Sequence, residues 1–393
     1  MANTINSELL EKIITKAQVV LRQKTPLLSM VGTNFTDDFA SKGTTISAPV
    51  AAPITTADIT PANTAPSPAD ISISAQTLSL AYEKKAPFKF SATESQKYSL
   101  DKWMEQQVEN AVKYLVKDIN DSVWSKYYQI PYFKGDSGTG IFASGSLAQM
   151  GQIRRLLIDN ENDSQNLTMC VSTKDYADLL SASNFVYANY RGSDDIHKTG
   201  MITDFLGFKN IMEDIDAPTH TIGNFGSGGT ATAAATAAGL STVTVAVTVD
   251  AIALKQGDII RFGDGYNYSL QADVSVASGA SGTFTLDRGL EAPLAGTETA
   301  AFATDTGTFD ANSLVNIAGD FRGIGIGARR IAALIEGYAI QGTHIPFNDP
   351  VTGFPLTLSI YPQYHQTAFE VSALWGTAIM QSKMLARVLT YSS

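Results

Sequence analysis

The most regular pattern of apolar and polar positions in the chain spans residues 99–128. Apolar side chains recur there every three or four positions, namely Leu100, Trp103, Met104, Val108, Ala111, Val112, Leu115, Val116, Ile119 and Val123. This spacing places them on one face of an α-helix, and Pro131 lies beyond its end. At 1.5 Å per residue the predicted helix is roughly 45 Å long, well beyond the average helix of a compact domain. We therefore expect a long helix along which other elements pack.

A second helical pattern covers residues 7–23, with Asn6 as a candidate cap and Pro26 beyond the end. It predicts an amphipathic helix. Because Glu8 and Glu11 offset its basic residues, we expect this helix to dock on a protein surface rather than on a membrane.

From residue 43 the pattern changes to short alternating runs, TTISAPV, ISISAQTLSLAY and FKFS. Five of the 14 prolines lie between Pro49 and Pro68. Because proline cannot donate to a strand ladder, this composition predicts a long extended hairpin with a proline-rich tip. Such an arm has little core of its own and needs another surface to lie on, since an exposed strand edge invites pairing.

The second half of the chain mixes both periods. Residues 147–159 and the run KDYADLLSA predict helices, while LTMCVS and FLGFKNIMEDID predict strands. Between residues 223 and 309, the runs VTVAVTV, DIIRF, YNYSL and GTFTL predict a small all-β insertion, either a sandwich or a barrel. The α/β-type pattern returns from residue 313, and residues 356–390 predict strands that end in an apolar segment tipped by Lys and Arg. Together these elements predict an α+β fold.

Composition and charge narrow the function classes. The length of 393 residues suggests two or three domains. The formal net charge of −10 argues against a protein that binds DNA or RNA by neutralising phosphates. Residues 221–310 hold three basic and nine acidic residues, and this net of −6 is more than half of the total. Charged residues make up only 17% of the chain, so we expect a folded protein with a surface poor in charge.

Compartment signals are few. Cys170 is the single cysteine, which excludes an intramolecular disulfide. The first residues, MANTINSELL, lack a basic region followed by an apolar one, so we predict no signal peptide. The stretch over residues 231–249 is interrupted by threonines and a serine, so we predict no transmembrane span. We expect the chain to fold in a reducing cytoplasm.

Two glycine-rich or acidic runs imitate binding motifs. Gly323-Ile-Gly325-Ile-Gly327 lacks the third glycine of a dinucleotide loop, because Ala328 stands there, and we interpret it as a closely packed strand. Residues 159–163, DNEND, begin like a calcium loop. However, Ser164 replaces the required glycine and Cys170 replaces the bidentate glutamate, so we predict a polar turn that ends a helix.

No other group of residues suggests catalysis. The histidines His197, His220, His344 and His365 are too far apart in sequence for a zinc motif, and we expect each to be exposed or hydrogen-bonded. Cys170 lies in an apolar run and is expected to be a buried small hydrophobe. We therefore predict no catalytic, cofactor-binding or metal-binding residue, no cofactor and no enzyme activity.

Three runs resemble a known family. They are residues 43–49 (GTTISAP), 200–218 (GMITDFLGFKNIMEDIDAP) and 254–270 (LKQGDIIRFGDGYNYSL). With the order of elements, they resemble the major capsid protein of tailed bacteriophages with the Hong Kong 97-type fold, and are most similar to podovirus coat proteins that carry an inserted β domain. The resemblance implies seven spans: an N-terminal arm (1–41), an extended hairpin loop (42–92), a spine helix of the peripheral domain (93–131), a first axial part (132–222), the inserted β domain (223–309), an axial return (310–341) and a peripheral return (342–393).

The resemblance also implies a function and partners. Such a chain assembles as hexamers and pentamers into an icosahedral procapsid, which encloses double-stranded DNA in the virion after assembly in the bacterial host cytoplasm. A separate scaffolding protein and a portal are expected, a decoration protein is left open, and no membrane is involved. The acidic charge predicts weak direct contact with the packaged DNA.

Two other function classes stay open at this point. In one, the β insertion is a ligand- or receptor-binding module without catalytic activity, and the rest of the chain is its scaffold. In the other, the chain is an enzyme with an unrecognised site. Particles seen by electron microscopy would favour the capsid protein, whereas a monomer in every condition would favour the binding module.

Overall fold

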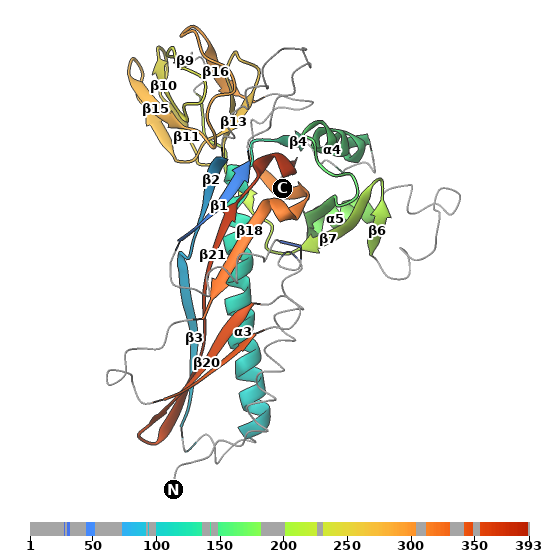
Figure 1. Ribbon diagram of the computed structural model, residues 1–393, viewed down its shortest axis with the longest axis vertical. Helices are drawn as coiled ribbons and strands as arrows, with labels where there is room; N and C mark the ends of the chain where they lie inside the picture. The colour runs from blue at the N-terminus through green and yellow to red at the C-terminus, as the bar shows by residue number, and fades with distance from the viewer. Residues whose placement is uncertain are drawn as a thin grey trace, which may run out of the picture.

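A computed structural model of the chain describes residues 27, 30–31, 45–51, 73–91, 93, 100–135, 142, 148–181, 201–225, 231–303, 312–330, 342–348 and 354–391. The predicted helix over residues 7–23 and the proline-rich hairpin tip lie outside the described residues. The molecule is elongated, with a long helix and long strands running away from two more compact parts (Figure 1). The predicted α+β class is confirmed.

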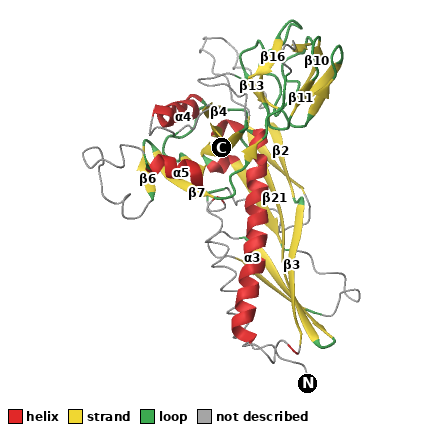
Figure 2. Cartoon of the chain, turned by 180° about the vertical axis from the view of Figure 1, so that it is seen from behind, coloured by secondary structure: helices red, strands yellow, loops and turns green. Residues whose placement is uncertain are grey.

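The long part, which we call the blade, is built on helix α3, Leu100–Trp124, which continues as the 3-10 turn η3, Ser125–Gln129. The helix predicted over residues 99–128 is therefore confirmed. Five residues of its predicted apolar stripe are buried: Val112, Leu115, Val116, Ile119 and Val123. They face a sheet that lies along α3, as Figures 1 and 2 show from opposite sides.

The blade sheet has the order β18-β21-β20-β19, and β3 pairs with β21 as well. Its strands are β3 Tyr82–Ser91, β18 Ile324–Arg329, β19 Thr343–Asn348, β20 Pro355–Gln363 and β21 Gln366–Ile379. The predicted hairpin is present at its base, where β1 Thr45–Ala51 pairs antiparallel with β2 Ile73–Ser79.

A second, mixed sheet has the order β4-β22-β17-β5-β7-β6, with β8 beside β17. The strands are β4 Phe133–Gly135, β5 Thr168–Ser172, β6 Ile202–Phe205, β7 Phe208–Asp214, β8 Thr219–His220, β17 Ser313–Gly319 and β22 Leu385–Tyr391. Helices α4, Ala148–Asp159, and α5, Thr173–Leu180, contribute to its core. Helices α4 and α5 agree with the helices predicted over residues 147–159 and in KDYADLLSA, and strands β5 and β7 agree with the strands predicted in LTMCVS and FLGFKNIMEDID. We call the blade and this mixed-sheet region together the body.

One bent pair of antiparallel segments belongs to both sheets. Gly319 lies opposite Leu385 in the mixed sheet, and Ile324 lies opposite Ile379 in the blade sheet. Between these pairs stand two 3-10 turns, η5 Phe321–Gly323 and η6 Ser382–Met384. Backbone hydrogen bonds join them, from Asp320 N to Met384 O at 3.0 Å and from Met380 N to Gly323 O at 2.8 Å.

This pairing differs from the expected division of the chain. The span 310–341 was expected to be axial and the span 342–393 peripheral, yet β18 lies in the blade sheet and β22 lies in the mixed sheet. The reason is that the two segments stay paired on both sides of the turns, with a shift of one residue between them, so each segment crosses from one sheet to the other. A boundary at a single sequence position cannot describe such an exchange.

Residues 231–303 form a compact all-β part, which we call the barrel. Its strands are β9 Ala231–Ala233, β10 Thr242–Val247, β11 Ile252–Leu254, β12 Ile259–Arg261, β13 Asn267–Ser269, β14 Val274–Val276, β15 Ser281–Thr285 and β16 Thr299–Phe302. The sheet runs β13-β12-β16-β9-β10-β15, and a bridge between Leu270 and Leu286 returns β15 to β13. Of the two predicted architectures, the structure has the barrel.

A glycine in the blade provides a test of the close approach between β2 and β21. A Cβ at Gly376 would overlap the carbonyl oxygen of Ser79, whereas a Cβ at Gly151 in α4 would meet nothing within 4 Å. We expect Gly376→Ala to lower the free energy of unfolding by about 1–3 kcal/mol and the control Gly151→Ala to raise it by about 0.5–1 kcal/mol. Denaturant unfolding followed by tryptophan fluorescence measures both, and equal effects of the two variants would contradict this packing.

Candidate functional site

The motifs that imitate binding sites in the sequence have structural roles in the fold. Gly325 and Gly327 are buried in β18, opposite Ala378 and Gly376, as the closely packed strand predicts. The acidic run ends α4, because Asn162 donates through Nδ2 to Leu157 O at 2.9 Å. Both interpretations are confirmed.

Cys170 is fully buried in β5. Burial raises the pKa of its thiol well above the ordinary value, and the nearby Asp214 carboxylate raises it further. A thiol held in its neutral form is a poor nucleophile, which agrees with the predicted buried hydrophobe.

The histidines do not gather. His344 lies 2.9 Å from Ser359 Oγ through Nδ1, His365 packs edge-on against Tyr364, and His197 lies outside the described residues. Within the described part of the chain, no group of three or more His, Cys, Asp or Glu side chains is placed to hold a metal ion. No described helix combines the length and apolar character needed to cross a bilayer.

The densest group of buried polar contacts lies where the barrel meets the body, and we call it the joint. It combines side chains or backbone groups of Tyr127, Tyr128, Ile130, His220, Gly257, Asp258, Ser269 and Arg387. These residues come from the end of the spine segment, from β8, from the barrel and from β22. The joint therefore connects four regions that are distant in sequence.

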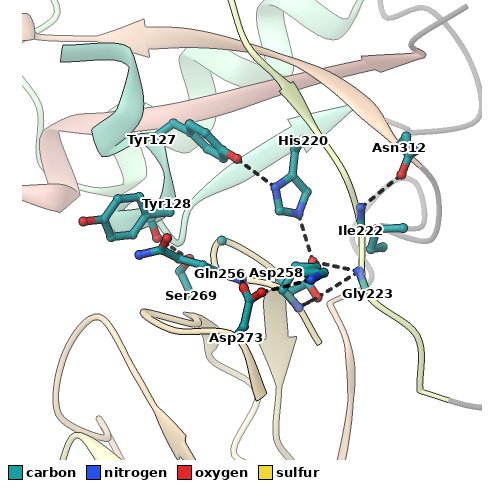
Figure 3. Close-up of polar contacts among 12 residues, drawn as sticks. Tyr127, Tyr128, His220, Ile222, Gly223, Gln256, Asp258, Ser269, Asp273 and Asn312 are labelled. Atoms are coloured by element: carbon teal, nitrogen blue, oxygen red, sulfur yellow. Dashed lines mark hydrogen bonds and ion pairs between the residues drawn. The ribbon is translucent and has the colours of Figure 1, made fainter. Parts of the chain in front are cut away.

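His220 lies between Tyr127 and Asp258 (Figure 3). Its Nε2 is 2.8 Å from Asp258 Oδ1 and its Nδ1 is 3.0 Å from Tyr127 Oη. Because a carboxylate only accepts, Nε2–H donates to Asp258 and the Tyr127 hydroxyl donates to Nδ1. Asp258 Oδ2 also accepts the backbone N–H groups of Gly223 at 3.1 Å and Lys255 at 2.8 Å. His220 is therefore hydrogen-bonded, as expected, and is also buried.

Arg387 is fully buried at the centre of the joint. Its guanidinium donates to four acceptors: Ile130 O at 2.6 Å, Gly257 O at 2.6 Å, Ser269 Oγ at 2.6 Å and Tyr128 O at 3.3 Å. None of these four acceptors carries a charge, and burial lowers the pKa of Arg387 to about 10. The carbonyl groups of Tyr128 and Ile130 close the C-terminal end of the spine segment, where a helix favours a cation.

Apolar and aromatic contacts surround this polar centre. A buried cluster joins the barrel residues Ile259 and Ala303 to the body residues Phe133, Val315 and Leu389. At its side, the guanidinium of Arg288 from the barrel lies 5.2 Å from the ring centroid of Tyr132 in the body. The joint thus combines the buried guanidinium of Arg387, its hydrogen bonds and an apolar surround.

A second buried carboxylate fixes the spine helix to the mixed sheet. Asp214 at the end of β7 accepts from Asn120 Nδ2 at 2.9 Å, Trp124 Nε1 at 3.0 Å and the backbone N–H of Asp216 at 2.9 Å. Like the joint, it uses its polar groups to hold two parts of the chain together. The chemistry that both arrangements support is orientation of structural elements.

The sequence did not reveal the joint. Arg387 was expected at the polar tip of an apolar segment, but it is among the most deeply buried residues of the chain. The available signal was its position inside the run LARVLT, where Leu385, Ala386, Val388 and Leu389 are all apolar and all buried. A charged residue in such a run indicates a buried partner set, although not which residues supply it.

No protein-family model and no curated protein matches this sequence. The chain is similar to the capsid structure of the cyanophage P-SCSP1u, at 10% identity and a TM-score of 0.49, over 93% of this chain and 87% of that chain. It is similar to the capsid asymmetric unit of cyanophage A-1(L), at 11% identity and a TM-score of 0.48, over 94% and 93%.

A structure from Mycobacterium phage Che8 is similar at 10% identity and a TM-score of 0.49, over 91% of this chain and 89% of that chain. These structures come from phages.

Two buried tryptophans provide a matched test of the Asp214 anchor. Trp124 donates to the carboxylate of Asp214, while Trp375 donates to the neutral hydroxyl of Ser122 at 2.9 Å. Replacement by Phe removes one N–H donor in each case. We expect Trp124→Phe to cost about 1.5–3 kcal/mol of unfolding free energy and Trp375→Phe about 0.5–1.5 kcal/mol. Denaturant unfolding followed by circular dichroism checks this order, and a larger cost for Trp375→Phe would contradict the anchor.

Thiol labelling tests the environment of Cys170. Because the pKa of this buried thiol is raised, we expect the native chain to resist a thiol reagent at pH 8 and to react with one equivalent after unfolding in guanidinium. Full labelling of the native chain, counted by mass spectrometry, would contradict the described burial.

Proposed function

We propose that this chain is the major capsid protein of a tailed bacteriophage, which self-assembles as hexamers and pentamers into the icosahedral shell around double-stranded DNA. The observation that carries the proposal is the blade, where a helix of 25 residues lies along a sheet whose β21 strand has 14 residues. In the described part of the blade, the outer strands β3 and β19 keep exposed side chains, which neighbouring subunits can cover.

The hairpin supports the same proposal. Among the described strands, β1 pairs only with β2, although Ser79 at the end of β2 lies against β21. Strand pairing alone leaves a two-stranded hairpin at best marginally stable in water. A hairpin of this kind gains stability when it lies on a second subunit. The low charge of the chain, 17%, suits a surface that is buried between copies.

The proposed division of the chain keeps the spans expected from the resemblance, with one change. Residues 1–41 are the arm, 42–92 the extended loop, 93–131 the spine, 132–222 the first axial part and 223–309 the inserted domain. Residues 310–341 are the axial return and residues 342–393 the peripheral return. The exceptions are β18, which lies in the blade sheet, and β22, which lies in the mixed sheet. The closed barrel and its separate core support an insertion as an independent unit.

The proposed role is structural and non-catalytic. The buried polar groups described above are occupied by contacts between parts of the chain. The barrel interior is filled by its own side chains, which include Val243, Val245, Tyr268 and Phe284. This filling speaks against a ligand cavity inside the barrel, so no observation favours the ligand-binding alternative.

The proposed partners follow from this role. A separate scaffolding protein and a portal guide assembly in the host cytoplasm, and the finished chain resides in the virion capsid. The net charge of −10 disfavours tight binding of packaged DNA. A decoration protein is compatible with this proposal.

Electron microscopy of the purified chain tests the function. We expect closed shells, sheets or polyheads, with a higher yield of closed shells when a candidate scaffolding protein is co-expressed. A monomer or small oligomer in every condition would contradict the proposal.

A deletion tests the role of the barrel in assembly. Removing residues 223–309 leaves Arg387 and His220 without their barrel partners, so we expect fewer normal particles and a less stable subunit. Particle yield on a sucrose gradient measures this, with full-length chain as the control. Normal particles at normal yield would show that the barrel has no part in stabilising the subunit or regulating assembly.

A further inference from the structure

We propose that the barrel docks onto the body only when strand β22 has entered the mixed sheet, because β22 brings the Arg387 guanidinium that the joint requires. Docking is then conditional on completion of the body. This inference concerns the subunit itself and goes beyond the proposed function.

The barrel has what it needs to fold without the body. Its sheet closes on itself through the Leu270–Leu286 bridge, with backbone bonds from Gln271 N to Thr285 O and from Asp287 N to Ser269 O. Its core is a cluster of buried apolar side chains from residues 231 to 300, and this cluster is distinct from the clusters of the body. Folding of the barrel and docking of the barrel are therefore separate events.

Placement of β22 and placement of Arg387 are one event. In the sheet, Arg387 pairs with Ile317 of β17 on one side and with Phe133 of β4 on the other. Its backbone N–H donates to Tyr132 O at 2.8 Å. With the backbone held in this way, the side chain reaches Gly257 O and Ser269 Oγ of the barrel, both at 2.6 Å.

The joint favours all-or-none docking. Asp258 and Asp287 favour the charged form of Arg387 from nearby without accepting one of its four hydrogen bonds. A buried guanidinium is costly unless its donors are satisfied. The two barrel acceptors complete the set that Tyr128 and Ile130 begin. A body without Arg387 would leave Ile130 O of the body and Gly257 O of the barrel without their guanidinium donor, and unpaired buried acceptors oppose docking. Arg387 therefore stabilises the docked state, and its absence opposes docking of the barrel onto an incomplete body.

Hydrogen exchange of the full-length chain tests the requirement for Arg387. The test variant is Arg387→Met, and the control is Arg261→Met, since Arg261 donates to Gly265 O within the barrel. In Arg387→Met we expect at least tenfold faster exchange in peptides over residues 126–133 and 219–225, with little change in β10 and β21. The control should leave the joint peptides unchanged. Unchanged exchange of the joint in Arg387→Met would overturn the proposal.

If Arg387→Met does not accumulate as folded protein, Ser269→Ala tests the same contact by changing its partner in the barrel. This variant removes one acceptor of Arg387 and one donor to Tyr128 O. Faster exchange in the same joint peptides supports the proposal, and unchanged exchange overturns it. Both readouts come from the unassembled subunit, so a chain that forms no particles would contradict the proposed function without affecting this result.

Pulse-labelling during refolding tests the order of events. We expect β10 to gain protection independently of β22, and the joint peptides to gain protection no earlier than β22. Protection of the joint before β22 would overturn the proposal.

Discussion

The antiparallel pairing between residues 313–329 and 374–391 is the contact on which both sheets of the body depend. It continues through two facing 3-10 turns, where the pairing shifts by one residue between Gly319–Leu385 and Ile324–Ile379. Backbone hydrogen bonds at these turns join the blade to the mixed sheet. Gly319 stands at this bend with a φ of 141°, and a Cβ there would overlap the carbonyl oxygen of Met384. Only glycine fits this approach. Since a slip of one residue would turn every side chain of both strands to the wrong face, the bend constrains both cores at once.

Polar groups are buried where the parts of the chain meet. Asp214 accepts a hydrogen bond from Trp124 of the spine helix, and Arg387 donates one to Gly257 of the barrel. Asp175 at the start of α5 accepts hydrogen bonds from three strands, through Ser172, Asn316 and Thr390. Apolar contacts tolerate sliding, whereas a planar guanidinium with four fixed acceptors accepts one orientation. The chain thus combines apolar packing within each part with directional hydrogen bonds between parts.

Periodic features of the sequence predicted the local structure well. The apolar stripe of α3 is long enough to identify a helix and its buried face, and the alternation of Val243, Val245 and Val247 identifies the inward face of β10. The joint could not be predicted in this way, because Arg387 and its partners Gly257 and Ser269 are separated by 130 and 118 residues. The exchange of β18 and β22 between the two sheets could not be predicted for the same reason. Periodicity reports which face of a strand is buried, and it carries no information about which sheet the strand joins.

The distance in sequence between the two sides of the joint has a consequence for synthesis on the ribosome. The barrel ends at residue 303, which is 84 residues before Arg387 (387 − 303), and at about 5–20 residues per second this corresponds to roughly 4–17 s of translation. During that interval a completed barrel is tethered to a nascent chain that has no guanidinium to offer it. The barrel therefore spends its first seconds as a free module beside the ribosome, and its apolar joint residues, Ile259 and Ala303, are then open to chaperones.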